Sequence, residues 1–374
     1  MQNNTLTLLV PGLLTKRFFE QRANLSLPHL SYLLSRADRE TLPSEANTTP
    51  DYCGAMLEYQ LCQAVGLEQP FPYAALAALG DGLAHQDDYW LYASPMSFTL
   101  GMHDACVSKP HELHLHRTQV DELVKELNTF LANDGLCLYA FQLHHWYLKV
   151  SGERPGDYAP FWSVVGKSLS KAQLSSAASA YWQRLSVELQ LLLTSSSIPI
   201  ANEVAARREL VSNRSVQIVH QDCEQAKQRS RSFIGDGYIN HLWFWGGGSL
   251  PQTLDVVYDA VVATHPLAEG IAILGKTPYI ELPVRGFDKL QEMPIGNYLV
   301  AIDTLQSAWF DESPERWLSQ VHQLEAQWFL PLARAIKQGT LHTLILQLGN
   351  NERFVVSPSQ LRRWWRRSKS LDKF

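Results

Sequence analysis

The feature that most constrains the fold of this chain is the alternation of short apolar runs with longer helical patterns. Thr5 to Val10 is a brief apolar run that Pro11 and Gly12 stop, which is typical of a buried strand entering a loop. Later strands are predicted over 239–245, 298–302 and 343–348, and helices over 267–274 and 314–336. This alternation predicts an α/β fold with a mostly parallel sheet and helices on both faces.

A change to short strand-like runs around one helical pattern predicts a small inserted α+β unit over residues 86–152. Strand-like runs at 90–92, 112–116, 136–141 and 146–150 surround a helical pattern at 119–131. The predicted organisation is therefore a first part of the α/β core over 1–85, the insert over 86–152, and a second part of the core over 153–374. Residues 202–236 carry many charges and few large apolar side chains, which predicts a polar insertion within that last part.

Charge and cysteine content indicate the cellular compartment in which the protein is expected. The formal net charge is -5, so the whole chain has no attraction for nucleic acid or an anionic membrane. No stretch reaches transmembrane length, and the N-terminus lacks the basic start and cleavage site of a signal peptide. Five widely spaced cysteines fit reduced thiols. We therefore expect a cytoplasmic protein with no membrane contact.

One basic patch stands out near the C-terminus, where Arg362, Arg363, Arg366 and Arg367 surround Trp364 and Trp365. If Pro358 begins a helix, the tryptophans can anchor that helix on the sheet while the arginines remain solvated. The alternative is that the patch contacts an anionic partner, an acidic protein surface or a nucleic-acid backbone. Both interpretations remain open on the sequence.

The segment Asn240-His241-Leu242-Trp243-Phe244-Trp245-Gly246-Gly247-Gly248 resembles a signature of the bacterial regulatory proteins of the Rpf E type. Five further segments resemble that family in the same order: 8–14, 35–39, 75–82, 89–91 and 361–367. The chain also resembles, more distantly, the archaeal-type cofactor-independent phosphoglycerate mutases of the alkaline phosphatase superfamily. That resemblance implies an alkaline-phosphatase-like fold with an inserted unit.

The residues that the mutase resemblance requires for catalysis are missing. Such mutases hold two divalent metals, and their first ligand is an Asp at the end of the opening strand, where this chain has Pro11. Their serine nucleophile opens a helix that should lie within 51–66, a stretch without Ser or Thr. Because this chain departs from the family at these positions, we expect no catalytic residue, no metal ligand and no cofactor.

Candidate ligand-binding residues remain at three places. His144 and His145 precede a predicted strand, as the substrate-binding His-Arg pair of the mutases does. Gly246, Gly247 and Gly248 are expected to form a turn, either strained backbone or an anion-binding nest. Asp303 follows a predicted strand and is either a remnant ligand or a cap. The sequence favours a non-catalytic, mutase-like protein with a regulatory or scaffolding role over a divergent metal-dependent phosphomonoester mutase or hydrolase.

Overall fold

The computed structural model describes residues 4–23, 25–42, 55–100, 105–107, 113, 116–143, 145–156, 158–165, 180–195, 239–284, 286–290 and 292–374. The chain forms two compact units. The first comprises Met1–Phe71, Leu76–Ala84 and Pro251–Phe374, and the second comprises Pro72–Ala75 and His85–Leu250. The predicted polar insertion at 202–236 lies outside the described residues.

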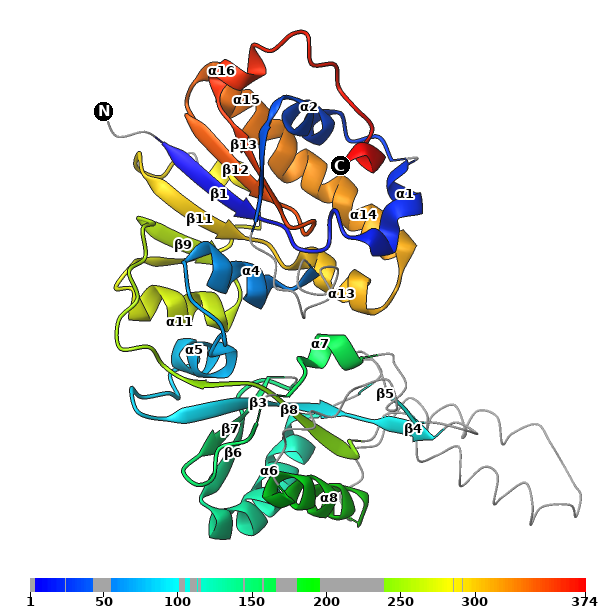
Figure 1. The fold of residues 1–374 in the computed structure, drawn as a ribbon, viewed down its shortest axis with the longest axis vertical. Helices are drawn as coiled ribbons and strands as arrows, with labels where there is room; N and C mark the ends of the chain where they lie inside the picture. Colours follow the sequence, from blue (N-terminus) through cyan, green and yellow to red (C-terminus); the bar gives the residue numbers. More distant parts are fainter. Residues whose placement is uncertain are drawn as a thin grey trace, which may run out of the picture. The chain divides into compact units, whose positions relative to one another are not determined.

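The first unit is built on a seven-stranded, mostly parallel sheet. Its strand order is β10-β9-β11-β1-β12-β13-β2, and β1 from the N-terminal end lies between β11 and β12 from the last third of the chain (Figure 1). The pairs among β10, β9, β11, β1 and β12 are parallel, whereas β13 and β2 add an antiparallel edge. The strands are β1 (Thr5–Leu9), β2 (Asp38–Thr41), β9 (Ala260–Ala263), β10 (Tyr279–Glu281), β11 (Asn297–Ala301), β12 (Thr343–Gln347) and β13 (Glu352–Val356).

Helices cover this sheet. All residues of β1 from Leu6 to Leu9 are buried, so both faces of the central strand are covered, as the apolar run predicts. Helix α4 contacts β1, α11 contacts β9, and α2 contacts both β13 and α15. The helices of the first unit are α1 (Phe19–Ala23), α2 (Pro28–Arg36), α4 (Leu57–Ala64), α11 (Pro266–Leu274), α12 (Phe287–Leu290), α13 (Thr304–Phe310), α14 (Pro314–Leu324), α15 (Leu330–Gln338) and α16 (Pro358–Leu361), with 3-10 turns η1 (Lys16–Phe18) and η5 (Leu371–Lys373). Helix α5 (Tyr73–Gly80) has residues in both units.

The helix predicted over 314–336 is present with one irregularity. A π-helical turn, η4 (Glu325–Phe329), joins α14 to α15. The buried Glu325 carboxylate accepts the backbone N–H of His29 at 2.7 Å and that of Leu30 at 3.3 Å. It thereby satisfies donors at the first turn of α2, whose N-cap Leu27 has no side-chain oxygen.

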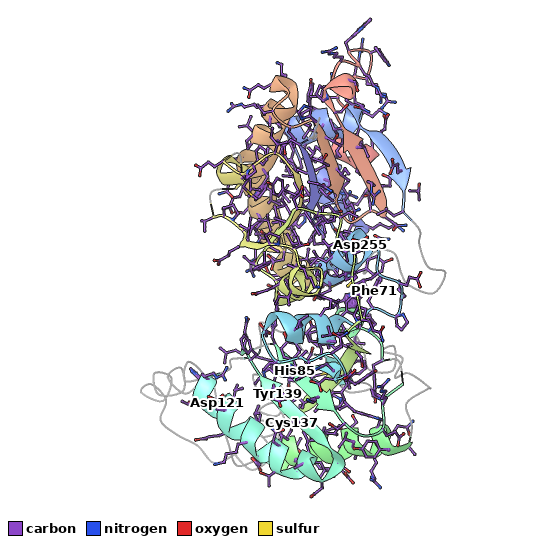
Figure 2. The ribbon with its side chains drawn as sticks, turned by 90° about the vertical axis from the view of Figure 1, so that its left-hand side faces the viewer. Phe71, His85, Asp121, Cys137, Tyr139 and Asp255 are labelled. Atoms are coloured by element: carbon purple, nitrogen blue, oxygen red, sulfur yellow. The ribbon has the colours of Figure 1, made fainter. Side chains whose placement is uncertain are left out.

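The second unit contains a four-stranded antiparallel sheet of order β6-β7-β3-β8. Alternate residues of its strands form an apolar core with α6 and α8, and this core contains Leu136, Leu138, Leu123 and Leu185. Cys137 and Tyr139 alternate with the core residues of β6 (Figure 2). The elements are β3 (Tyr89–Met96), β4 (Phe98–Leu100), β5 (Ala105–Val107), α6 (Arg117–Leu131), η3 (Ala132–Asp134), β6 (Leu136–Ala140), β7 (Trp146–Val150), α7 (Phe161–Val164), α8 (Ala180–Ser195) and β8 (His241–Ser249).

The two units differ from the division into 1–85, 86–152 and 153–374 expected from the sequence. The second unit extends to Leu250, because β8 pairs antiparallel with β3 and α8 contacts β8. An expected strand over 112–116 lies largely outside the described residues. None of the described helices has the length and apolar character that crossing a membrane requires.

Candidate functional site

In parallel sheets of this kind, ligands bind at the carboxyl ends of the strands, so a candidate site is expected there. In the first unit, β1 leads into Val10-Pro11-Gly12, β9 into Thr264 and His265, and β11 into Ile302 and Asp303. Strand β12 leads into Leu348 and Gly349. All of these segments belong to the first unit.

The loop after β1 is buried and held on several sides. Residues 11–15 are all buried. The backbone N–H of Val10 donates to the Gln347 carbonyl at 2.9 Å, and that of Leu14 donates to the Leu348 carbonyl at 2.8 Å. The indole of Trp317 donates to the Gly12 carbonyl at 3.2 Å. The loop is thus bonded to the neighbouring strand and to α14.

Aromatic side chains fill the space beside this loop. A Cβ atom added to Gly12, which has φ of +85°, would lie 3.6 Å from Leu305 Cβ and 3.8 Å from Trp309 Cδ1. Trp309 is 2% exposed and Trp317 is fully buried. The guanidinium of Arg17 lies 3.9 Å from the Trp309 ring centroid and donates to the Trp309 carbonyl at 2.6 Å. The mutase resemblance requires a metal-binding carboxylate at Pro11, and the indole rings of Trp309 and Trp317 pack against the adjacent Gly12.

A polar cluster that the sequence reasoning missed lies at the same edge of the sheet. Glu58 of α4 lies with its Oε1 atom 3.7 Å from His265 Nε2, and Gln306 Nε2 donates to Glu58 Oε2 at 3.3 Å. Burial lowers the pKa of His265 to about 4, although the nearby Asp303 charge acts in the opposite direction. His265 is therefore neutral at pH 7.

The imidazole of His265 has a structural task. It occupies the N-cap of α11, where its Nδ1 atom accepts the backbone N–H of Leu267 at 3.2 Å. Since Nδ1 accepts, the ring proton of the neutral form is on Nε2, on the side of Glu58. The sequence signal was the His265-Pro266 pair, because Pro is common at the first position of a helix. The contact with Glu58 could not be read from the sequence, since it joins residues far apart in the chain.

Asp303 lies where a helix cap was expected, but it does not cap with its side chain. It is half-buried at the N-cap position of α13, and its carbonyl, not its carboxylate, accepts the N–H of Gln306 at 2.8 Å. Within the described part of the chain, no group of three or more His, Cys, Asp or Glu side chains has the arrangement of a metal site.

His145 and the three glycines belong to the second unit, whereas Asp303 belongs to the first. His145 is half-buried just before β7, and His144 lies outside the described residues. The expected turn at Gly246–Gly248 is wrong, because these residues continue β8 to Ser249. A shift of register opposite Trp90 and Tyr92 of β3 marks a β-bulge there, and Gly246 has φ of +64°.

The glycines of β8 are required by close packing. A Cβ atom on Gly247 would lie 2.5 Å from Tyr89 Oη and 2.7 Å from Leu91 Cδ2. One on Gly248 would lie 2.6 Å from Pro72 Cβ. Since every one of these neighbours belongs to the second unit, the glycines serve its internal packing.

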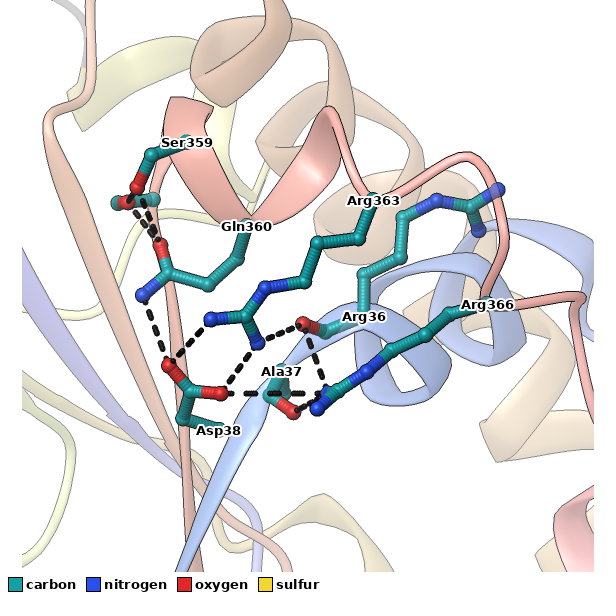
Figure 3. A network of polar contacts seen from close by, with 8 residues as sticks. Arg36, Ala37, Asp38, Ser359, Gln360, Arg363 and Arg366 are labelled. Atoms are coloured by element: carbon teal, nitrogen blue, oxygen red, sulfur yellow. Dashed lines mark hydrogen bonds and ion pairs between the residues drawn. The ribbon is translucent and has the colours of Figure 1, made fainter.

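The four arginines of the C-terminal basic patch fall into two groups, those that bond to β2 and its neighbouring residues and those that do not. The helix expected from Pro358 ends at Leu361, so it does not carry the tryptophans onto the sheet. Arg363 forms a two-pronged ion pair with Asp38 of β2, and Arg366 donates to the Ala37 carbonyl at 2.8 Å (Figure 3). Hydrogen bonds from Arg363 and Gln360 lower the pKa of Asp38 to about 2. Arg362 and Arg367 are exposed.

No protein-family model matches the chain and no curated protein matches it, so the resemblance to the Rpf E type stays a prediction. Among solved structures, the chain is similar to the PH0037 protein from Pyrococcus horikoshii, with a TM-score of 0.51, 11% identity, and coverage of 96% of this chain and 88% of that chain. It is also similar to the cofactor-independent phosphoglycerate mutase from Thermoplasma acidophilum, with a TM-score of 0.36, 12% identity, and coverage of 95% and 90%. The first likeness shows a shared fold, and the class is an α/β protein with a mostly parallel seven-stranded sheet.

Proposed function

We propose that this protein is a non-catalytic relative of the phosphoglycerate-mutase-like, alkaline-phosphatase-like proteins and acts as a regulatory or scaffolding protein. One observation carries the proposal: the loop that leaves the central strand has Pro11 at the ligand position and is buried under Trp309 and Trp317. Phosphoryl transfer by two metals needs carboxylates and an open approach for the substrate. The Pro11 side chain has no metal-binding group, and the indole rings of Trp309 and Trp317 lie against the adjacent Gly12.

The neighbouring residues support the same function. His265 is neutral and uses Nδ1 to cap α11, so that nitrogen is not available to a metal. Arg17 lies on the Trp309 ring and also pairs with Glu312 at 3.3 Å, so this cation is engaged within the fold. The polar groups at this edge thus serve local structure.

A divergent phosphomonoester mutase or hydrolase is the second candidate, and the cluster of the buried His265 with the half-buried Glu58 and Asp303 favours it. An imidazole next to a carboxylate is a common pairing in general acid–base catalysis. The Gln347 side chain, at the end of β12, is also buried without a hydrogen bond among the described residues, as a polar ligand site would allow. The two candidate functions differ in the role of His265, which is a structural helix cap in the first and a catalytic group in the second.

Substitution of His265 separates them. Asn at an N-cap accepts the same backbone N–H, whereas Ala does not. We expect His265→Asn to fold with near-parental stability and His265→Ala to lose about 0.5–2 kcal/mol. The parental protein, His265→Asn and His265→Ala are to be assayed with 2-phosphoglycerate and p-nitrophenyl phosphate in Mg²⁺, Mn²⁺ and Zn²⁺. We expect no turnover by any of them and no stoichiometric metal by elemental analysis.

Chelator-sensitive turnover by the parental protein, lost in the well-folded His265→Asn variant, would establish the enzyme instead. Turnover that survives His265→Asn would also contradict the non-catalytic proposal, but it would place the chemistry away from this cluster. Equal stability of the Asn and Ala variants would show that the cap formed by His265 does not stabilise α11.

A further inference from the structure

The C-terminal segment presents two tryptophans to solvent on an ordered part of the fold. Trp364 is 81% exposed and Trp365 is 64% exposed. Their ring centroids lie 6.1 Å apart, and their planes are inclined at 84°. Arg362, Arg367 and Lys369 flank them and are exposed. We call these five residues the tryptophan surface.

The exposure is imposed by contacts on either side. Before the tryptophans, Arg363 pairs with Asp38, and Gln360 donates to the same carboxylate at 3.0 Å (Figure 3). After them, the backbone N–H of Lys369 donates to Ser35 Oγ at 2.8 Å, and Leu371 is 1% exposed. The segment is tied down at both ends, and the rings between these ties remain in water.

The charge around the rings is positive. The guanidinium groups of Arg363 and Arg366 compensate the negative charge of the nearby Asp38 carboxylate. In the described part of the chain the guanidinium groups of Arg362 and Arg367 form no ion pair. A hollow of about 660 Å³ lies beside Trp365 and is lined by Asp38, Arg39, Arg366, Arg367 and Lys369, together with Leu34, Ser35 and Ala37. The two indole rings and several positively charged side chains thus lie close together on one small area of the surface.

We propose that the tryptophan surface binds single-stranded nucleic acid. Unpaired bases supply flat faces that stack on indole rings, and the phosphates between them supply the negative charge that free arginines attract. Two adjacent rings at a steep angle give each base its own platform, whereas an acidic helix or a lipid surface is better matched by one continuous apolar face. A duplex keeps its base faces stacked inside. The net charge of -5 opposes long-range attraction to any polyanion, so binding is confined to this surface.

The test is fluorescence anisotropy of a labelled oligothymidylate and a labelled oligouridylate of about 12 nucleotides, titrated with the full chain, because binding sites of single-strand binders span about 4–16 nucleotides. Trp364→Ala with Trp365→Ala is expected to weaken binding at least about tenfold. Arg362→Gln with Arg367→Gln is expected to reduce the slope of log affinity against log salt by about 1.4, since each of the two lost phosphate contacts contributes about 0.7. Lys16→Gln with Lys125→Gln removes two exposed cations elsewhere and is expected to leave binding unchanged within about twofold.

Several outcomes overturn the proposal. These are no binding at about 50 mM salt, duplex binding as tight as single-strand binding, or affinity untouched by the double tryptophan variant. Displacement of the oligonucleotide by polyglutamate at equal charge concentration would assign the surface to an acidic protein. Sedimentation with phosphatidylglycerol vesicles but no oligonucleotide binding would assign it to a lipid surface. Preference for one oligonucleotide would distinguish RNA from DNA as the natural source.

Discussion

Two pairs of tryptophans in the first unit are used in opposite ways. Trp309 and Trp317 are 2% and 0% exposed and pack around the loop after β1, whereas Trp364 and Trp365 are 81% and 64% exposed. The first pair occupies the edge of the sheet where a ligand would bind in this type of fold. The second pair lies among cations on the surface. The pair at the sheet edge is thus buried, whereas the C-terminal pair, for which the sequence allowed either packing on the sheet or contact with a partner, is exposed.

The difference has a physical cause in what each pair contacts. Trp317 stacks on Phe18 with ring centroids 5.0 Å apart and donates to the Gly12 carbonyl. Trp364 and Trp365 contact each other, and the segment that carries them is held by the arginine partners of Asp38. Burial of an indole contributes to stability through area and packing, whereas an exposed indole contributes little until a partner covers it.

The largest expected effect is on stability, and it tests the contrast between the buried and the exposed tryptophan pairs. Trp317→Ala leaves a cavity in the core and removes the hydrogen bond to Gly12, so we expect a loss of about 3–5 kcal/mol in the free energy of unfolding. Trp364→Ala with Trp365→Ala is the matched control and is expected to change that free energy by less than about 0.5 kcal/mol. Urea denaturation followed by circular dichroism measures both. Equal losses in the two variants would contradict the contrast.

The second expected effect is a dependence of stability on pH, which tests the burial of His265 at the edge of the sheet. Burial lowers the pKa of both His265 and His241 to about 4. In the unfolded chain each histidine has a pKa near 6.5, so between pH 6.5 and 4 the unfolded state binds more protons than the folded state. Stability therefore falls as the pH is lowered through this window, by about 3 kcal/mol for each histidine at pH 4. Denaturation at a series of pH values measures it.

His265→Asn is the control for the pH effect. It keeps the cap of α11 and removes the titrating imidazole, so we expect the fall in stability with acid to be reduced to the part due to His241. A pH dependence unchanged by His265→Asn would show that the imidazole is solvated.

The central strands could be predicted from the sequence because their signal is local. The run at Thr5–Val10 and the strand at 146–150 were identified by apolar patterning, and the structure has β1 and β7 there. The edge strand β2, with the charged sequence Asp38-Arg39-Glu40-Thr41, was missed because edge strands carry charges and lack the apolar pattern. Patterning thus finds buried strands and passes over exposed ones.

The site could be predicted only in part, since its decisive contacts join distant segments. Three glycines in a row indicate a turn, but Tyr89, Leu91 and Pro72 crowd them into a strand. Pro358 indicates a helix start, and α16 does begin there, but Arg363 turns toward Asp38 and the helix stops at Leu361. Neither the pairing of Glu58 with His265 nor that of Asp38 with Arg363 leaves a signal in the local sequence.

The smallest expected effect tests how the exposed pair is held. Arg363→Gln removes the ion pair with Asp38, and Arg367→Gln removes a neighbouring exposed charge that has no such partner in the described residues. We expect Arg363→Gln to lower the melting temperature slightly, by less than either effect above, because surface ion pairs contribute little. Arg367→Gln should leave it unchanged.

The pH dependence of that small difference identifies its source. The pKa of Asp38 is about 2 in the folded protein, below its ordinary value of 3.8, so the stability that the ion pair contributes is present above pH 3.8 and is lost as the pH falls through 2. The difference in melting temperature between the parental protein and Arg363→Gln should therefore disappear between these two values. A difference that persists at pH 2 would mean that Arg363 acts through its hydrogen bond to the Arg36 carbonyl at 3.4 Å, and the tryptophans would then be held in place independently of Asp38.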